Sequence, residues 1–360
     1  MSQPPTCVIY NPAAGRGRAR DLVNQVRTWA APGAEMRETS APGHGVELAR
    51  AAADEGFERV IAAGGDGTVN EVANGLMRAD RRATMGVWPL GSSNDYAFAL
   101  GLDDWFRAEG KGVPLRPRAA DVGVVSGGRR EHFYLNCAGV GFNGMVALDS
   151  RKIRWLRGMP LYALAYLRCL LWHFRAPPAV VEWGDGVGHP TPSGELRSPG
   201  DPSPTGRGGG RGVSPQVQPP PPLPAGEGSA RREAGGPGVG MSTKWMSLTS
   251  PLLALTVNVG VREGGFPITP AARVDDGRFD FVHVADLRRW DLIRLLPALM
   301  AGKIPADEPK IRTGTAARVR VTSGVPLCCH ADGEFACVPA DGVTELTFDT
   351  LPGRVTVEGA

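Results

Sequence analysis

The stretch GGDGT, residues 64–68, has residue types that could bind a phosphate group. The apolar residues 60–63 before it are typical of a buried strand, and apolar residues after it recur at helical spacing. In such a strand-to-helix turn, glycines let a ligand approach the main chain, and the new helix offers unpaired N–H groups and the positive end of its dipole. A plain tight turn, capped by Asp66 or Thr68, explains this stretch equally well when it is taken alone.

Two further loops of small and polar residues follow apolar runs in the same half of the chain. NPAAGRG begins at Asn11 and contains Gly15, with several arginines close by, and GSSND occupies residues 91–95. Each loop alone is a weak signal, because an Asn-Pro turn is usually only a turn. The loops indicate a binding site only if the strands before them lie in the same sheet.

Short apolar runs and helical stretches alternate up to about residue 125, with helices expected over 19–30 and 45–56. This alternation predicts a mainly parallel sheet flanked by helices, with ligands at the carboxyl ends of the strands. After residue 130 the segments become β-rich and are separated by Gly, Pro or Asp, which favours an antiparallel sandwich or barrel. We therefore predict an α/β domain over 1–128 and a β-sandwich domain over 129–360.

Two segments of the second domain differ from this pattern. Residues 161–174, LYALAYLRCLLWHF, predict a helix; packing on the sheet is the favoured interpretation and contact with a membrane the alternative. Residues 184–240 are about half Gly and Pro, and they contain no aromatic residue after Trp183. We predict that 184–240 is a disordered insertion.

Composition limits the remaining possibilities. The chain has 360 residues, 42% of them hydrophobic, and a formal net charge of +3, which gives no sign of nucleic-acid binding. Its six cysteines form no CxxC pair, so reduced thiols in a cytosolic protein are expected, and a metal at LCCH, residues 327–330, is disfavoured. The sequence shows neither a basic, apolar leader nor an apolar run of about 20 residues, so we expect a soluble protein.

The order of the three loops, and the motifs after them, resemble the diacylglycerol kinase-like lipid kinases. These include bacterial diacylglycerol kinases and sphingosine kinases. The resemblance continues through NCAGVGFNGMVA, VNVGVREGGF, DDGRFD and HADGEF, so it spans most of the chain apart from the insertion. GGDGT alone is shared with NAD kinases and phosphofructokinases. The resemblance implies a nucleotide-binding α/β domain of that type, followed by a lipid-binding antiparallel β-sandwich, with ATP and Mg²⁺ as cofactors.

The same resemblance implies roles for individual residues. The general base corresponds to Glu334, and a structural magnesium corresponds to Asp276 with main-chain oxygens of Arg273 and Arg278. The implied nucleotide contacts are Asn11, Pro12, Gly15, Arg16, Thr39, Gly64, Gly65, Asp66, Gly67, Thr68, Asn70 and Ser92.

Phosphoryl transfer requires a protein to hold the phosphates, neutralise charge and orient the attacking hydroxyl. Main-chain N–H groups of the GGDGT turn would hold phosphate, and Asp66 would hold a magnesium ion or its waters. Glu334 would accept the proton of a lipid alcohol, with Asp332 and Asp66 as alternative bases. A hairpin turn residue is the other interpretation of Glu334.

The sequence thus predicts an ATP-dependent lipid kinase that converts diacylglycerol to phosphatidic acid. An NAD kinase-like enzyme and a non-catalytic nucleotide or lipid sensor are the alternatives. The expected partners are a membrane lipid and the inner face of the membrane, which a cytoplasmic protein would contact peripherally. A homodimer is a further expectation.

Overall fold

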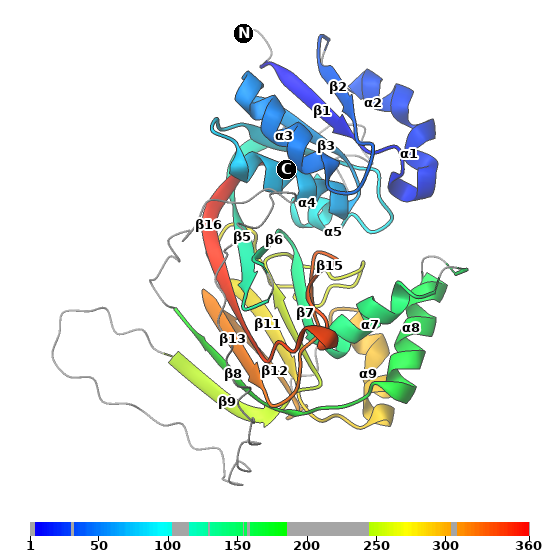
Figure 1. Cartoon of the computed structure of the whole chain (residues 1–360), viewed down its shortest axis with the longest axis vertical. Helices are drawn as coiled ribbons and strands as arrows, with labels where there is room; N and C mark the ends of the chain where they lie inside the picture. The colour runs from blue at the N-terminus through cyan, green and yellow to red at the C-terminus, as the bar shows by residue number, and fades with distance from the viewer. Residues whose placement is uncertain are drawn as a thin grey trace, which may run out of the picture. The chain divides into compact units, whose positions relative to one another are not determined.

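Figure 1 shows a computed structural model of the chain. It describes residues 4–29, 32–102, 115–128, 130–153, 155–156, 159–185, 245–303 and 308–359. The predicted disordered insertion, 184–240, lies outside the described residues from residue 186 onward.

The first part of the chain forms a parallel sheet with helices around it. Strand β1 pairs in parallel with β2 and β3, and β3 pairs in parallel with β4, as the alternating pattern predicted. The strands are β1 (Thr6–Tyr10), β2 (Glu35–Glu38), β3 (Arg59–Gly64) and β4 (Thr84–Pro89). The helical elements are η1 (Ala14–Gly17), α1 (Arg18–Asp21), α2 (Val23–Trp29), α3 (His44–Glu55), α4 (Asp66–Arg78) and α5 (Asp95–Ala99).

This sheet continues into the second part of the chain through the last strand, β16 (Glu345–Gly359). β16 pairs in parallel with β4 and antiparallel with both β5 (Arg116–Ser126) and β13 (Arg318–Ser323). The strand order is β2-β1-β3-β4-β16-β13-β8-β9, with β5 beside β16 and β6 beside β5. The strands not yet bounded are β6 (His132–Tyr134), β8 (Pro178–Gly184) and β9 (Trp245–Pro251).

A second, wholly antiparallel sheet has the order β12-β11-β10-β7-β14-β15. Its strands are β7 (Cys137–Gly141), β10 (Ala254–Asn258), β11 (Phe279–Val284), β12 (Ile311–Ala316), β14 (Cys329–Ala331) and β15 (Glu334–Cys337). One face packs against the first sheet, where the rings of Phe281 and Trp183 lie 5.3 Å apart. The predicted β-sandwich is therefore confirmed.

Three helices pack on the other face of the second sheet, as Figure 1 shows. They are α7 (Phe142–Ser150), α8 (Met159–Trp172) and α9 (Arg289–Met300). Phe142, Leu170 and Leu292 from these helices form one buried cluster with Leu253 and Val282 from the sheet side. A short helix, η2 (Pro339–Asp341), precedes the last strand.

The prediction that residues 161–174 form a helix packed on the sheet is confirmed: α8 ends at Trp172 and packs on the sheet through one of its sides. Cys169 and Leu170 are buried, whereas Leu167, Leu171 and Trp172 are exposed. Nowhere in the described ranges is there a helix with both the length and the apolar character needed to cross a membrane. All six cysteines are buried free thiols.

Candidate active site

The two glycine loops after β3 and β4 meet through their main chains. A Cβ atom added to Gly91 would lie only 2.5 Å from the Cα atom of Gly65, and the N–H of Leu90 donates to the carbonyl oxygen of Gly64 at 2.8 Å. Asn94, at φ 54°, closes the second loop by accepting a hydrogen bond from the Gly91 N–H at 2.8 Å. The contact leaves no room for side chains, so GGDGT and GSSND form one main-chain surface at the start of α4. We call it the glycine surface.

Asn11 connects the first loop to these two. Its amide nitrogen donates to the Thr68 hydroxyl at 2.9 Å, and its amide oxygen accepts from the Ala13 N–H at 2.9 Å. Thr39 is buried at the end of β2, and its N–H donates to the carbonyl oxygen of Tyr10 at 2.9 Å. These contacts place three of the predicted nucleotide loops at the carboxyl ends of β1, β3 and β4.

The other predicted nucleotide residues differ in how closely they approach this surface. Gly67 has open space where a Cβ would stand, Ser92 is exposed beside Gly91, and Pro12 and Gly15 lie in the loop after β1. The side chain of Arg16 lies outside the described part of the chain.

Asp66 begins α4, and its carboxylate faces the start of α5. Oδ1 of Asp66 accepts a hydrogen bond from the Tyr96 N–H at 3.1 Å. Burial raises the pKa of Asp66, and main-chain N–H groups of residues 94–96 oppose that rise by stabilising the charged form. The carboxylate is therefore held at a fixed position beside the glycine surface.

Asp95, which the sequence did not single out, is the neighbour of Asp66 in space. Both oxygens of its carboxylate accept from the N–H of Gly265, at 2.9 and 3.2 Å. Burial raises the pKa of Asp95 to about 7, and the nearby charge of Asp66 adds to the rise. Asp95 thus ties the Gly264–Gly265 turn of the second part of the chain to the loops predicted to bind nucleotide.

Asp332 is half-buried, and both of its carboxylate oxygens are hydrogen-bonded. Its carboxylate accepts from the N–H groups of Leu135, Asn136 and Cys137 at 2.7, 3.2 and 2.9 Å. A fourth hydrogen bond comes from the amide nitrogen of Asn70 at 3.0 Å. Burial raises the pKa of Asp332, while these donors act in the opposite direction. Asn70, predicted as a nucleotide contact, is therefore engaged with the second part of the chain.

Glu334 lies just beyond the tight turn formed by Asp332 and Gly333, both of which have positive φ. Its side chain is 68% exposed, and its Oε1 atom lies 3.5 Å from Nη2 of Arg151. The same nitrogen donates to the carbonyl oxygen of Gly333 at 2.5 Å, and the guanidinium lies over the ring of Phe335 at 4.6 Å. Arg151 therefore holds the turn and the Glu334 carboxylate from one side, a contact that the sequence did not indicate.

The predicted magnesium residues lie in the loop before β11. Oδ1 of Asp276 accepts from the Arg278 N–H at 3.0 Å. Nearby, the buried Asp121 accepts from the Gly277 N–H at 2.6 Å and from the Gly353 N–H at 2.8 Å. The predicted set of one carboxylate and the main-chain oxygens of Arg273 and Arg278 contains only oxygen atoms, which suits Mg²⁺. Among the described residues, no three His, Cys, Asp or Glu side chains gather as a metal site.

A second polar cluster, also missed from the sequence, lies on the second sheet. Nε2 of His330 lies 3.2 Å from Oε1 of Glu263, and the amide nitrogen of Asn143 donates to the Thr256 hydroxyl at 2.8 Å. A Cβ at Gly139 would lie 2.6 Å from Nε2 of His330, so this glycine makes room for the cluster. Neither sequence spacing nor residue type pointed to it, because its members come from two strands, a helix and the loop that contains Glu263.

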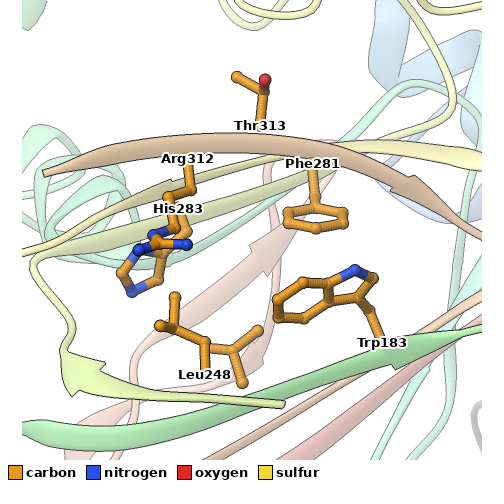
Figure 2. Close-up of a pocket in the computed structure, with 7 residues that line it drawn as sticks. Trp183, Leu248, Phe281, His283, Arg312 and Thr313 are labelled. Atoms are coloured by element: carbon orange, nitrogen blue, oxygen red, sulfur yellow. The ribbon is translucent and has the colours of Figure 1, made fainter. Parts of the chain in front are cut away.

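A cavity of about 180 Å³ lies elsewhere, between the two sheets. Figure 2 shows Trp183 and Phe281 facing each other in it, with His283 and Arg312 beside Leu248. None of the residues predicted for the site lines this cavity. Its mainly apolar walls belong to β8, β9, β11 and β12, so it does not mark the candidate active site.

Comparison with known proteins identifies two consecutive domains. Residues 5–134 match the diacylglycerol kinase catalytic domain, and residues 240–358 match the YegS C-terminal NAD kinase beta sandwich-like domain. A crystal structure of a diacylglycerol kinase from Bacillus anthracis covers the whole chain at a TM-score of 0.60 and 17% identity, a likeness that concerns the fold.

Two curated relatives have a higher sequence identity over about half of the chain. A protein of Bacillus subtilis named diacylglycerol kinase is 36% identical over 45% of this chain and 54% of its own length. A protein of Chromohalobacter salexigens named probable lipid kinase YegS-like is 33% identical over 50% of this chain and 57% of its own length. The chain thus spans a little over half the length of these relatives.

Proposed function

Because the chain belongs to the diacylglycerol kinase-like lipid kinase family, we propose that it transfers the γ-phosphate of ATP to the hydroxyl group of a membrane lipid. The acceptor that we propose is diacylglycerol, and the product is phosphatidic acid. The names of the relatives support this proposal. The arrangement of the loops supports it too, because it suits the binding of phosphate groups.

One observation carries the proposal: the hydrogen bond of 3.0 Å between Asn70 and Asp332. Asn70 lies one helical turn after Asp66 in α4, whereas Asp332 stands two residues before Glu334. This bond joins the helix that begins at the glycine surface to the turn that carries Glu334. This connection supports the proposal that a phosphate donor at the glycine loops and a proton acceptor at Glu334 act on the same hydroxyl group.

The glycine surface fits the phosphates of ATP. The contact between Gly65 and Gly91 brings two loops without side chains together, Gly67 has open space where a Cβ would stand, and the N–H groups of the first turn of α4 favour a negative charge. Asn11 and Thr68 hold each other at the edge of this surface, so their polar atoms are positioned before a nucleotide arrives. Bound Mg²⁺ would neutralise phosphate charge, and Asp66 is the carboxylate placed to hold it or its waters.

Glu334 suits the role of general base better than Asp332 does. The four donors around Asp332 occupy its lone pairs inside the protein, whereas the exposed carboxylate of Glu334 is open to a substrate. In the proposed step, Glu334 accepts the proton of the lipid hydroxyl while that oxygen forms a bond to the γ-phosphorus. The bond from phosphorus to the β,γ-bridging oxygen breaks, and ADP leaves with the electron pair.

The acceptor can be identified with labelled ATP and a panel of alcohols. We suggest diacylglycerol, monoacylglycerol, ceramide and sphingosine in mixed micelles, together with NAD in solution. The proposal expects label in phosphatidic acid above all. Label in NADP would instead indicate an NAD kinase, and nucleotide binding without transfer to any acceptor would indicate a sensor.

A further inference from the structure

Helices α8 and α9 carry large apolar side chains on their outer surface. We define this outer face by the following six residues: Tyr162, Leu167, Leu171, Trp172, Trp290 and Ile293. Trp172 is 66% exposed and Trp290 is 78% exposed. Large apolar side chains exposed together on neighbouring helices often mark a place where another apolar body binds.

Helix α8 is apolar on both sides, which is unusual for a helix at a protein surface. Ala165, Cys169 and Leu170 face the core, while Leu167 and Leu171 face outward one helical turn apart. A surface helix normally presents polar residues on its outer side, and a helix that is apolar all round is buried or lies in a membrane. The outer side of α8 therefore lacks a partner among the described residues.

The two helices contribute to one continuous surface. A guanidinium nitrogen of Arg289, at the start of α9, donates to the carbonyl oxygen of Leu171 near the end of α8 at 3.4 Å. The same guanidinium lies 5.6 Å from the ring centre of Phe174. Trp172 and Trp290 each follow one of the two hydrogen-bonded residues in the sequence, so the outer face spans the junction of both helices.

The charges around this face are mainly positive. Residues 159–176 and 288–300 together contain five arginines and only one acidic residue, Asp291. Arg288, Arg289 and Arg294 are exposed beside Trp290 and Ile293. Tryptophan and arginine side chains together suit the interface of a bilayer, where rings enter the headgroup region and guanidinium groups meet lipid phosphates.

We propose that the outer face of α8 and α9 docks on a lipid bilayer that carries anionic headgroups. The choice of a bilayer as partner rests on the proposed function, because a lipid kinase must meet its acceptor at a membrane. A symmetric dimer through this face would oppose the arginines of one copy to those of the other. Charge complementarity therefore favours the bilayer over a second copy of the chain. The inner side of α8 packs on the sheet, as predicted for residues 161–174, and the outer side is the one that we propose for the bilayer.

The test is sedimentation of the full chain with vesicles of phosphatidylcholine, with and without phosphatidylglycerol. We expect binding to the anionic vesicles that weakens as salt rises. The double variant Trp172→Ser/Trp290→Ser should bind at least about tenfold more weakly, since two rings no longer enter the interface. Trp245→Ser, which alters another exposed tryptophan on β9, is the matched control and should bind like the wild type.

Two further measurements separate the possible outcomes. Phosphorylation of a short-chain diacylglycerol dispersed in water should be unchanged in the double variant, while phosphorylation of long-chain diacylglycerol in vesicles should fall. Equal vesicle binding by wild type and double variant overturns the docking proposal, as does a dimer in solution that the double variant abolishes. If the wild type binds vesicles through this face but phosphorylates no lipid, the proposed function fails and the docking surface stands.

Discussion

At the scale of single residues, Asp332 and Glu334 are two neighbouring carboxylates with different surroundings, and we propose the general base only at Glu334. We expect Glu334→Gln to lower turnover by a factor on the order of 10² to 10⁴, because it removes the proton acceptor and keeps the shape. The affinity for ATP should change little. Turnover at saturating lipid, measured beside ATP binding, checks this, with Glu345→Gln as a control at another exposed glutamate.

Asp332→Asn should behave differently from Glu334→Gln. An amide in place of the carboxylate offers too few acceptors for three main-chain N–H groups and the Asn70 amide, so the free energy of unfolding should fall by about 1–3 kcal/mol.

If Glu334→Gln retains more than about half of its activity, well outside the expected range, the base must be sought at Asp332 or Asp66.

Asp95 gives a prediction about pH. Its pKa is about 7 in the fold and about 3.9 in an unfolded chain, so between these values the unfolded chain has released a proton that the folded chain keeps. This site therefore lowers the free energy of unfolding as pH rises from about 4 to 7, by about 1.4 kcal/mol for each unit of pKa difference.

Asp95→Asn stays neutral and can still accept a hydrogen bond from Gly265. Thermal unfolding of both proteins should show the variant gaining stability over the wild type as pH rises through this window, with a constant difference above it. A difference that does not change between pH 4 and 7 would show that Asp95 is already ionised at low pH in the folded protein.

At the scale of elements, the contact between the loops after β3 and β4 is the feature most sensitive to side-chain size. In Gly91→Ala the new Cβ would lie 2.5 Å from Gly65 Cα, so the two loops must separate and the phosphate surface must change. We expect ATP binding to weaken at least about tenfold, as for the loss of one well-placed hydrogen bond to a charged group. Isothermal titration with ATP measures this.

Gly324→Ala is the control for that experiment, since nothing lies within 4 Å of its added Cβ and its φ is not positive. It should bind ATP like the wild type. Normal ATP binding by Gly91→Ala would mean that the nucleotide phosphates lie away from this contact.

Local sequence patterns predicted elements well where strand and helix follow each other directly. The turn from β3 into α4 begins the helix at Asp66, and the apolar residues Val69 and Val72 are buried, as their spacing indicated. By contrast, Pro352 and Gly353 separate two β-rich segments near the end of the chain in the sequence, whereas in the structure one strand, β16, runs unbroken from Glu345 to Gly359. A shift in register between Leu351 and Val355 absorbs Pro352 and Gly353, and such a bulge resembles a turn in the sequence.

At the scale of the whole molecule, local sequence patterns could not predict which strands pair when they lie far apart in the sequence. Thr356 of β16 pairs with Thr84 of β4, so the first sheet extends into the second part of the chain. The hydrogen bonds of Asp95 to Gly265 and of Asn70 to Asp332 likewise join residues 170 and 262 positions apart. Residue types identified Asp66, Asp332 and the glycine loops but not the role of Asp95, and only the fold shows which of these residues meet.

The insertion can be tested through the strands that flank it. Gly184 of β8 and Trp245 of β9 are register partners, so their ends lie close enough for a short hairpin connection. We expect that replacing residues 190–238 with a short Gly/Ser linker leaves a soluble protein with normal ATP binding and turnover. Circular dichroism and the kinase assay check this, and loss of ATP binding would show that the segment contributes to the fold.

The central claim is that the glycine surface and Asp66 hold ATP while its γ-phosphate is transferred to a lipid hydroxyl group. The most direct measurement is the transfer of label from γ-labelled ATP to diacylglycerol by the wild type and by Asp66→Asn, which keeps an acceptor for the Tyr96 N–H. We predict labelled phosphatidic acid from the wild type and none from the variant, with similar thermal stability for both proteins. Near-normal transfer by a stable Asp66→Asn protein, or no transfer by the wild type, would contradict this account.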